Sequence, residues 1–148
     1  MSSTKPESGS SLEHHFPITQ ENVQASFDAI FAPWIKAMGL TDLQVSQGFC
    51  SLRLPFSGHL KFSSGAVCGQ AMMSAIDTAA SMAAGTTDRV PRGTVYQHTH
   101  FLRPAIGGDF LVTAQVKRFG KSSIYLDCSI VTEETGALVA HAVLEFAV

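Results

Sequence analysis

SGAVCGQAMMSAIDTAASMAAG, residues 64–85, is the stretch that decides the fold of this chain. Alanine and methionine are good helix formers, and Gly85 is a typical helix stop, so the stretch predicts one long helix. Small or apolar residues lie on most of its circumference, which predicts a helix that is buried rather than laid on a surface.

Asp77 is the exceptional residue of this helix. Its neighbours at three and four residues' distance are Ser74, Met73, Ala80 and Ser81, and none of them is cationic. A carboxylate in such a place is either shielded from water or open to a pocket, and both environments suit acid–base chemistry. The alternative is that it caps a loop or pairs with a distant arginine, since most buried charges are paired.

The composition sets the class of protein. The chain has 148 residues, of which 45% are hydrophobic, and this fits one domain with a single core. A net charge of −2 argues against nucleic-acid binding through a basic surface. The three cysteines (Cys50, Cys68 and Cys128) lack metal-site spacing and indicate reduced thiols. With no secretory signal and no apolar membrane span, we expect a cytoplasmic protein without a metal or cofactor.

The N-terminal part divides into two segments. Residues 1–12 are polar and predicted to be flexible, and residues 13–148 are predicted to form one domain. A helix is expected from Thr19, with Pro33 kinking it and Gly39 ending it. Its apolar residues at helical spacing are Val23, Phe27, Ile30, Phe31 and Trp34.

The rest of the chain predicts strands. Two short strands are expected before the long helix and four after it, at residues 40–47, 48–54, 94–102, 110–119, 122–132 and 138–148. This order predicts an α+β fold in which a strongly curved antiparallel sheet wraps the long central helix. A lone domain would cover such a helix poorly, so we expect at least a dimer.

Three blocks of sequence resemble a known family. They are the spacing from Gly69 to Asp77, the run TVYQHTHFLRPA at 94–105 followed by Gly108-Asp109, and the closing run GALVA at 136–140. Together these blocks are similar to the hotdog-fold acyl-CoA thioesterases of the phenylacetate-pathway type. The resemblance covers about residues 40–148.

The resemblance implies a thioester hydrolase acting on acyl-CoA. The backbone N–H of Gly69 would bind the thioester carbonyl oxygen, aided by the helix dipole. Asp77, reached from the neighbouring protomer, would act as general base or nucleophile. Thr94 falls where some relatives carry a hydroxyl that orients the water. The expected assembly is a homodimer or a dimer of dimers, that is, a homotetramer, with shared active sites.

The chain departs from the family at the helix start. His-Gly-Gly is usual there, but this chain has Cys68-Gly69-Gln70, and Phe62 occupies the place of a common asparagine. The amide of Gln70 can donate in partial replacement. We therefore expect Cys68, Gln70, Phe62 and Arg103 to bind substrate. Arg103 is also a candidate for the coenzyme A phosphates, a role considered for three further residues, Lys117, Arg118 and Lys121; the alternative for all four is a solvated strand end.

The expected reaction is hydrolysis of a medium-chain or aryl acyl-CoA to free acid and coenzyme A. The alternatives are a non-catalytic acyl-CoA binding protein and a hotdog hydratase or dehydratase, which generally pairs a histidine with an acid. Cys68 at the helix start is a further candidate nucleophile, although a buried inert thiol is commoner. His98 and His100 share a strand face and would need a third ligand to hold a metal; a solvated face is the favoured interpretation.

Overall fold

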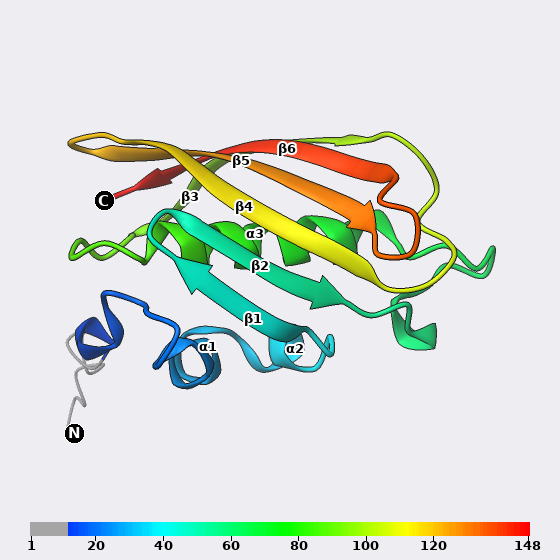
Figure 1. The fold of residues 1–148 in the computed structure, drawn as a ribbon, viewed down its shortest axis with the longest axis horizontal. Helices are drawn as coiled ribbons and strands as arrows, with labels where there is room; N and C mark the ends of the chain where they lie inside the picture. The colour runs from blue at the N-terminus through cyan, green and yellow to red at the C-terminus, as the bar shows by residue number, and fades with distance from the viewer. Residues whose placement is uncertain (1–11) are drawn as a thin grey trace, which may run out of the picture.

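One antiparallel sheet of six strands lies against a long helix, α3 (Gly69–Ala84), in the computed structural model, which describes residues 12–148 (Figure 1). The order of strands in the sheet is β1-β2-β4-β5-β6-β3. The strands are β1 (Thr41–Ser46), β2 (Phe49–Leu54), β3 (Gly93–Phe101), β4 (Phe110–Phe119), β5 (Ser123–Thr132) and β6 (Leu138–Ala147). The predicted α+β hotdog architecture is confirmed. All of the predicted flexible segment except Leu12 lies outside the described residues.

The core forms where α3 meets the sheet. Ala75, Ala79 and Ala83 recur every four residues on one side of the helix and are fully buried. Their small side chains let the backbone of α3 approach β2 and β4, the strands against which it chiefly packs. Large side chains such as Phe110 and Phe146 fill the space around this ridge. The helix is thereby held in one position along the sheet.

Helix α3 starts later than the composition of residues 64–85 predicts, at the place that the resemblance gives, Cys68-Gly69-Gln70. Residues 62–66 form a tight turn, in which Phe62 N donates to Ala66 O at 2.8 Å and Gly65 has a φ of +92°. A left-handed glycine of this kind opposes helix formation, so α3 begins only at Gly69. Cys68 caps it, because its Sγ accepts a hydrogen bond from Ala71 N at 3.4 Å.

The end of α3 is correctly predicted at Gly85, and the reason is packing. A Cβ on Gly85 would lie 2.7 Å from Ile18 Cδ1 and 2.9 Å from Phe16 Cε1. Ile18 N also donates to Gly85 O at 2.8 Å. A side chain at position 85 would therefore force Ile18 and Phe16 to shift from this close packing on the helix end.

The predicted N-terminal helix is two helices. A 3-10 turn, η1 (Glu13–His15), precedes α1 (Val23–Ile30) and α2 (Pro33–Lys36). Ala32 is extended, with a ψ of 151°, because the ring of Pro33 disfavours a helical residue before it. Pro33 therefore starts a second helix instead of kinking the first. The first begins after Thr19, whose N–H donates to Asn22 Oδ1 in a turn.

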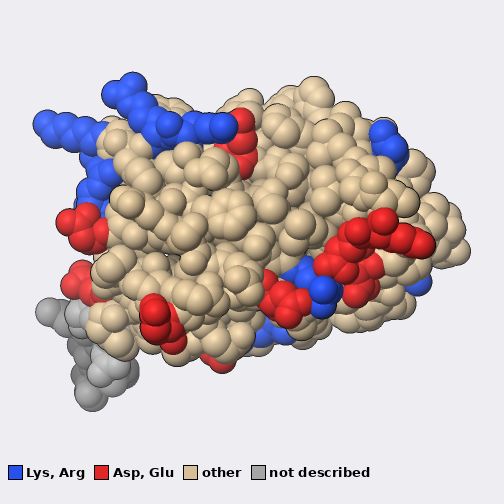
Figure 2. Space-filling view, in the orientation of Figure 1, with Lys and Arg blue, Asp and Glu red and all other residues tan. Residues whose placement is uncertain are grey.

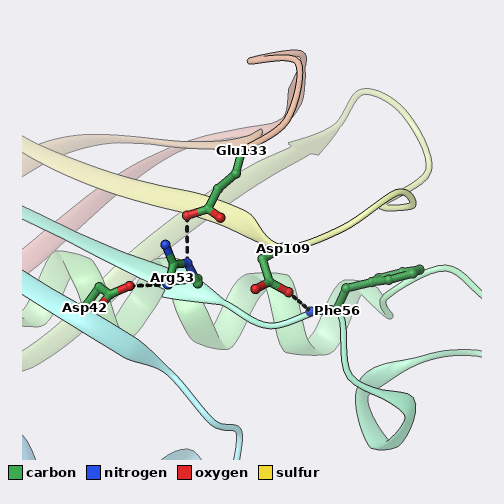
Figure 3. Close-up of polar contacts among 5 residues, drawn as sticks. All are labelled: Asp42, Arg53, Phe56, Asp109 and Glu133. Carbon is green, nitrogen blue, oxygen red and sulfur yellow. Dashed lines mark hydrogen bonds and ion pairs between the residues drawn. The ribbon is translucent and has the colours of Figure 1, made fainter.

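Asp109, which belongs to the family-like block, has a structural role. Its Oδ1 accepts a hydrogen bond from Phe56 N at 2.9 Å and so joins the end of β2 to the start of β4 (Figure 3). Beside it, Arg53 bridges Asp42 and Glu133, with a distance of 2.7 Å from its Nε to Glu133 Oε1. Among residues 12–148, no helix is long and apolar enough to cross a membrane.

Candidate active site

Asp77 lies half-buried on α3, and its carboxylate has a single side-chain partner. Thr94 Oγ1 donates to Asp77 Oδ1 at 2.5 Å. No ion pair among residues 12–148 includes Asp77, so the alternative of a distant arginine partner is wrong for the described chain. Met73, one turn earlier, is 40% exposed. This agrees with the expectation that a lone domain covers α3 poorly, because the face that carries Met73 and Asp77 is only partly covered.

An irregularity in β3 turns Thr94 toward Asp77. Thr94 pairs with Phe146 of β6 and Gln97 pairs with Leu144, so β3 takes three steps where β6 takes two. Both β6 partners are buried on the helix side, and Gln97 Nε2 itself donates to Met73 O at 3.3 Å. In a regular strand Thr94 and Gln97 would face opposite ways. The bulge at Val95 makes them face the same way.

Gly69 and Gln70 present free backbone N–H groups at the first turn of α3. The N–H of Ala71 is taken by Cys68 Sγ, and the N–H of Met72 by Cys68 O at 3.2 Å. Within the described chain, the N–H groups of Gly69 and Gln70 donate to no other group. Two unpaired donors at the positive end of a helix form a site that suits a developing negative charge on oxygen.

A hollow of about 560 Å³ lies beside this helix start. It brings together three of the residues predicted from the sequence, Gly69, Phe62 and Arg103. Phe101 of β3 also lines it, and a Cβ on Gly69 would lie 3.2 Å from Phe101 Cζ. A side chain at position 69 would therefore require the phenyl ring of Phe101 to shift.

The other two predicted binding residues, Cys68 and Gln70, line a different hollow. It has a volume of about 290 Å³ and is shared with Trp34 and His59. The predicted set of substrate-binding residues is therefore divided between two sides of the helix start. Side chains at successive helical positions diverge, and this explains the division.

Gly69 and Asp77 lie far apart within one chain. They are separated by eight helical residues, which corresponds to about 12 Å along the helix axis. A thioester carbonyl held at Gly69 is therefore out of reach of the Asp77 carboxylate of the same chain. One chain therefore supplies two separate parts of a site, the N–H donors at Gly69 and the carboxylate of Asp77. The two parts can act on one substrate only if a second chain brings them together.

The other cysteines, and the histidine pair on β3, form neither a reactive thiol nor a metal site among the described residues. Burial raises the pKa of the Cys50 thiol to about 12 and also raises the pKa of the Cys128 thiol. Both are poor nucleophiles for that reason. His98 Nε2 and His100 Nε2 approach to 2.6 Å on one strand face, as the sequence predicts. Within residues 12–148, no group of three His, Cys, Asp or Glu side chains has the geometry of a metal site.

The basic residues considered for coenzyme A phosphates do not gather at one place. Arg103 is in the β3–β4 loop, at the opposite end of the sheet from the β4–β5 turn that holds Lys121 (Figure 1). At that turn Lys and Arg side chains cluster (Figure 2). There, Arg89 and Arg92 line a hollow with Lys121. The sequence analysis missed these two arginines because their loop precedes β3 and only the fold brings it to the turn.

Comparison with known families identifies the chain. Residues 65–139, just over half of it, match the family model described as Thioesterase superfamily. The protein belongs to the Thioesterase superfamily. It is therefore a thioester hydrolase, and both Gly69 and Asp77 lie within the matched segment.

Solved structures of similar shape support the hotdog fold of this thioesterase. Zebra fish thioesterase superfamily member 2 is 20% identical, with a TM-score of 0.79 over 88% of this chain and 98% of that one. The E. coli PaaI protein from the phenylacetic acid degradation operon is 24% identical, with a TM-score of 0.73 over 84% and 92%. A conserved protein of Pseudomonas aeruginosa is 23% identical, with a TM-score of 0.74 over 81% and 96%. No curated protein sequence matches the thioesterase significantly.

Proposed function

We propose that the protein hydrolyses a medium-chain or aryl acyl-CoA to free acid and coenzyme A, as a thioesterase of the phenylacetate-pathway type. The observation that carries this proposal is the Asp77 carboxylate. It is half-exposed, has no cationic partner in the described chain, and is held by the Thr94 hydroxyl at 2.5 Å. A carboxylate that is oriented but not neutralised is available as a base or a nucleophile.

The active site is completed by a second copy of the chain, in a homodimer or a dimer of dimers. Phe101, at one end of β3, touches Gly69, while Thr94, near the other end, binds Asp77. If β3 pairs antiparallel with the same strand of a partner, Gly69 of one chain comes near Asp77 of the partner subunit. This pairing removes the separation of about 12 Å that exists within one chain.

In this arrangement Gly69 and Gln70 donate their N–H groups to the thioester oxygen and stabilise the negative charge that develops on it. Asp77 of the partner subunit takes a proton from water, whose oxygen attacks the carbonyl carbon, or it attacks that carbon directly. Collapse of the tetrahedral intermediate breaks the C–S bond, and the coenzyme A thiolate leaves. When Asp77 acts as base, the proton that it took from water passes to the thiolate and the free acid is formed at once. When Asp77 attacks directly, water then hydrolyses the acyl–Asp77 anhydride to the free acid and restores the carboxylate, and the thiolate takes its proton from solvent. Thr94 donates to Asp77 Oδ1 and so fixes which carboxylate oxygen faces the substrate.

The coenzyme A part is assigned to the hollow of about 560 Å³ beside Gly69. The hollow is open to solvent, and exposed Arg103 lies at its wall, where a guanidinium suits phosphate oxygens. No histidine stands at the start of α3, where Cys68 caps the helix, so the hydratase alternative has no acid–base pair to support it.

The first test replaces Asp77 by asparagine, which keeps the shape and removes the charge. We expect kcat/KM on an acyl-CoA panel to fall at least about 100-fold, because the nucleophile or base is lost. Loss of thioester absorbance measures the rate. Asp88→Asn, in the exposed loop after α3, is the control and keeps the wild-type rate. Wild-type rates in Asp77→Asn would remove Asp77 from the mechanism.

The same proteins separate hydrolysis from binding alone. Calorimetry with an acyl-CoA measures binding, and appearance of free thiol measures turnover. The proposed function requires both in the wild type, with binding but little turnover in Asp77→Asn. Binding without thiol release by the wild type over hours would identify an acyl-CoA binding protein instead.

A further inference from the structure

A small apolar hollow of about 210 Å³ lies on the far side of Asp77 from Gly69 and has no role in the site described so far. It is bounded by the N-terminal segment, the second half of α3 and the C-terminal strand. Its apolar wall includes Phe16, Ile18, Ile30, Phe31, Met82 and Phe146. Met82 and Phe146 are almost completely buried, so this part of the wall is fixed by the core.

The hollow begins beside the Asp77–Thr94 pair. Ser81 lines it, and Ser81 follows Asp77 by one helical turn, about 6 Å along the axis. Ser81 Oγ also donates to Asp77 O at 2.8 Å. On the opposite side the lining includes Gly93, which immediately precedes Thr94. A group that reacts at the Asp77 carboxylate is therefore next to this hollow.

The N-terminal segment closes the hollow and is itself held firmly. Ile18 N donates to Gly85 O at 2.8 Å, and Phe16 and Ile18 pack so closely on Gly85 that a Cβ there would force their side chains to shift. Ile30 and Phe31 complete the wall from the end of α1. Four side chains of the wall thus come from the N-terminal part of the chain, which precedes the segment that matches the family model.

We propose that this hollow receives the acyl group of the thioester and that its N-terminal wall sets the acceptable acyl length. The proposal rests on the proposed function and deepens it. An apolar cavity of about 150 Å³ holds benzene, so 210 Å³ corresponds on the same scale to an acyl group of about eight carbons or a small aryl group. The acid released would be of the octanoate or phenylacetate class.

The division of the substrate between the two hollows follows from their chemistry. In the proposed dimer the two hollows that hold one substrate belong to different chains, the small one beside Asp77 and the larger one beside Gly69 of the partner subunit. The larger hollow is open and carries an arginine, Arg103 in this chain's own copy, which suits the phosphate-bearing part. The smaller one has an almost wholly apolar lining, and exposed Arg92 is the one charged residue among the described residues that line it. Burying methylene groups there is favourable, whereas burying phosphates would be costly.

The test compares acyl chain lengths in wild type and in Ile30→Trp, which fills the hollow. In the wild type we expect kcat/KM to rise about fourfold for each methylene up to about eight carbons and then fall. In Ile30→Trp we expect at least a tenfold loss for octanoyl-CoA, with butyryl-CoA within about twofold of wild type. The control, Ala29→Trp, changes the neighbouring exposed position and keeps the wild-type profile.

A second variant, Phe31→Ala, enlarges the hollow and covers the case in which Ile30→Trp fails to fold. Its profile should shift toward decanoyl-CoA. An unchanged length profile in a folded variant, with full wild-type activity, would overturn the assignment of the hollow but leave the proposed function intact.

If the wild type hydrolyses no acyl-CoA, the proposed function fails and the hollow is still testable. Calorimetry with octanoate then measures binding of an acyl chain to the hollow directly. Binding to the wild type that Ile30→Trp weakens at least tenfold supports an acyl site. No binding to the wild type overturns it.

Discussion

The two edge strands of the sheet, β1 and β3, differ in how their open edges are covered. Every sheet edge exposes unpaired backbone N–H and C=O groups, and native proteins protect such edges. One edge of this molecule is protected by its own chain. The other is left open and apolar, at the strand that carries Thr94.

The β1 edge is protected by a single side chain of the N-terminal segment. Gln20 Oε1 accepts a hydrogen bond from Val45 N at 2.8 Å, and Gln20 Nε2 donates to Leu43 O at 3.1 Å. The amide of Gln20 thus bonds with β1 as the backbone of a neighbouring strand would. Helix α1 lies next to this edge (Figure 1).

The β3 edge has no such cover within residues 12–148. Val95 is 59% exposed and Tyr96 is 54% exposed, and Phe101 and Leu102 continue the apolar surface. A long exposed apolar edge would promote uncontrolled association in an isolated chain. The contrast with β1 supports the proposal that a second copy of the chain, which would also complete the proposed active site, covers β3.

The largest effect is expected from Tyr96→Glu at the open edge. Tyr96 and Tyr125 both pair with Glu145 of β6, from opposite sides. Tyr→Glu at either position places a carboxylate beside Glu145, but only position 96 lies at the edge. We expect Tyr96→Glu to weaken dimerisation at least about 100-fold and to abolish turnover, because like charges would meet at the interface.

Sedimentation or light scattering measures this effect. The matched variant Tyr125→Glu should remain dimeric and active. Equal dissociation constants for the two variants would mean that β3 is not the interface.

A smaller effect is expected from Gln20→Ala at the covered edge. The change removes two hydrogen bonds to β1, so the free energy of unfolding should fall by about 2 kcal/mol. Urea denaturation measures it. Gln24→Ala, which removes only a bond to Asp28 on the surface of α1, should cost much less. If both variants unfold at the same urea concentration, Gln20 does not protect the edge.

Much of this fold follows from local sequence signals. The strands were predicted within a residue or two of their ends, because β-branched and aromatic residues alternate with turns rich in glycine. The alanines of residues 64–85 predict the helix α3 but place its start too early, and only the resemblance gives the start at Gly69. The positive φ of Gly65 depends on a turn that pairs Lys61 with Val67.

The candidate site is harder to predict because its parts meet only in three dimensions. The sequence alone singles out Asp77, an acid in an otherwise small and apolar helix, and the resemblance adds Gly69 and Thr94. It does not reveal that the smaller hollow is closed by Phe16 and Ile30, because a contact between segments so far apart leaves no local pattern. Nor does it reveal the bulge at Val95, which arises from register with β6.

The smallest of these effects is expected from Thr94→Val, which tests the bulge. Valine keeps the shape of threonine and the register of β3 but removes the hydrogen bond to Asp77 Oδ1. We expect about a tenfold fall in kcat with the dimer intact, because the carboxylate loses its orientation and not its charge. Thr94→Ser, which retains the hydroxyl, should recover most of the activity. If serine and valine are equally impaired, the threonine acts through packing of the β3 edge, and the bulge serves dimerisation alone.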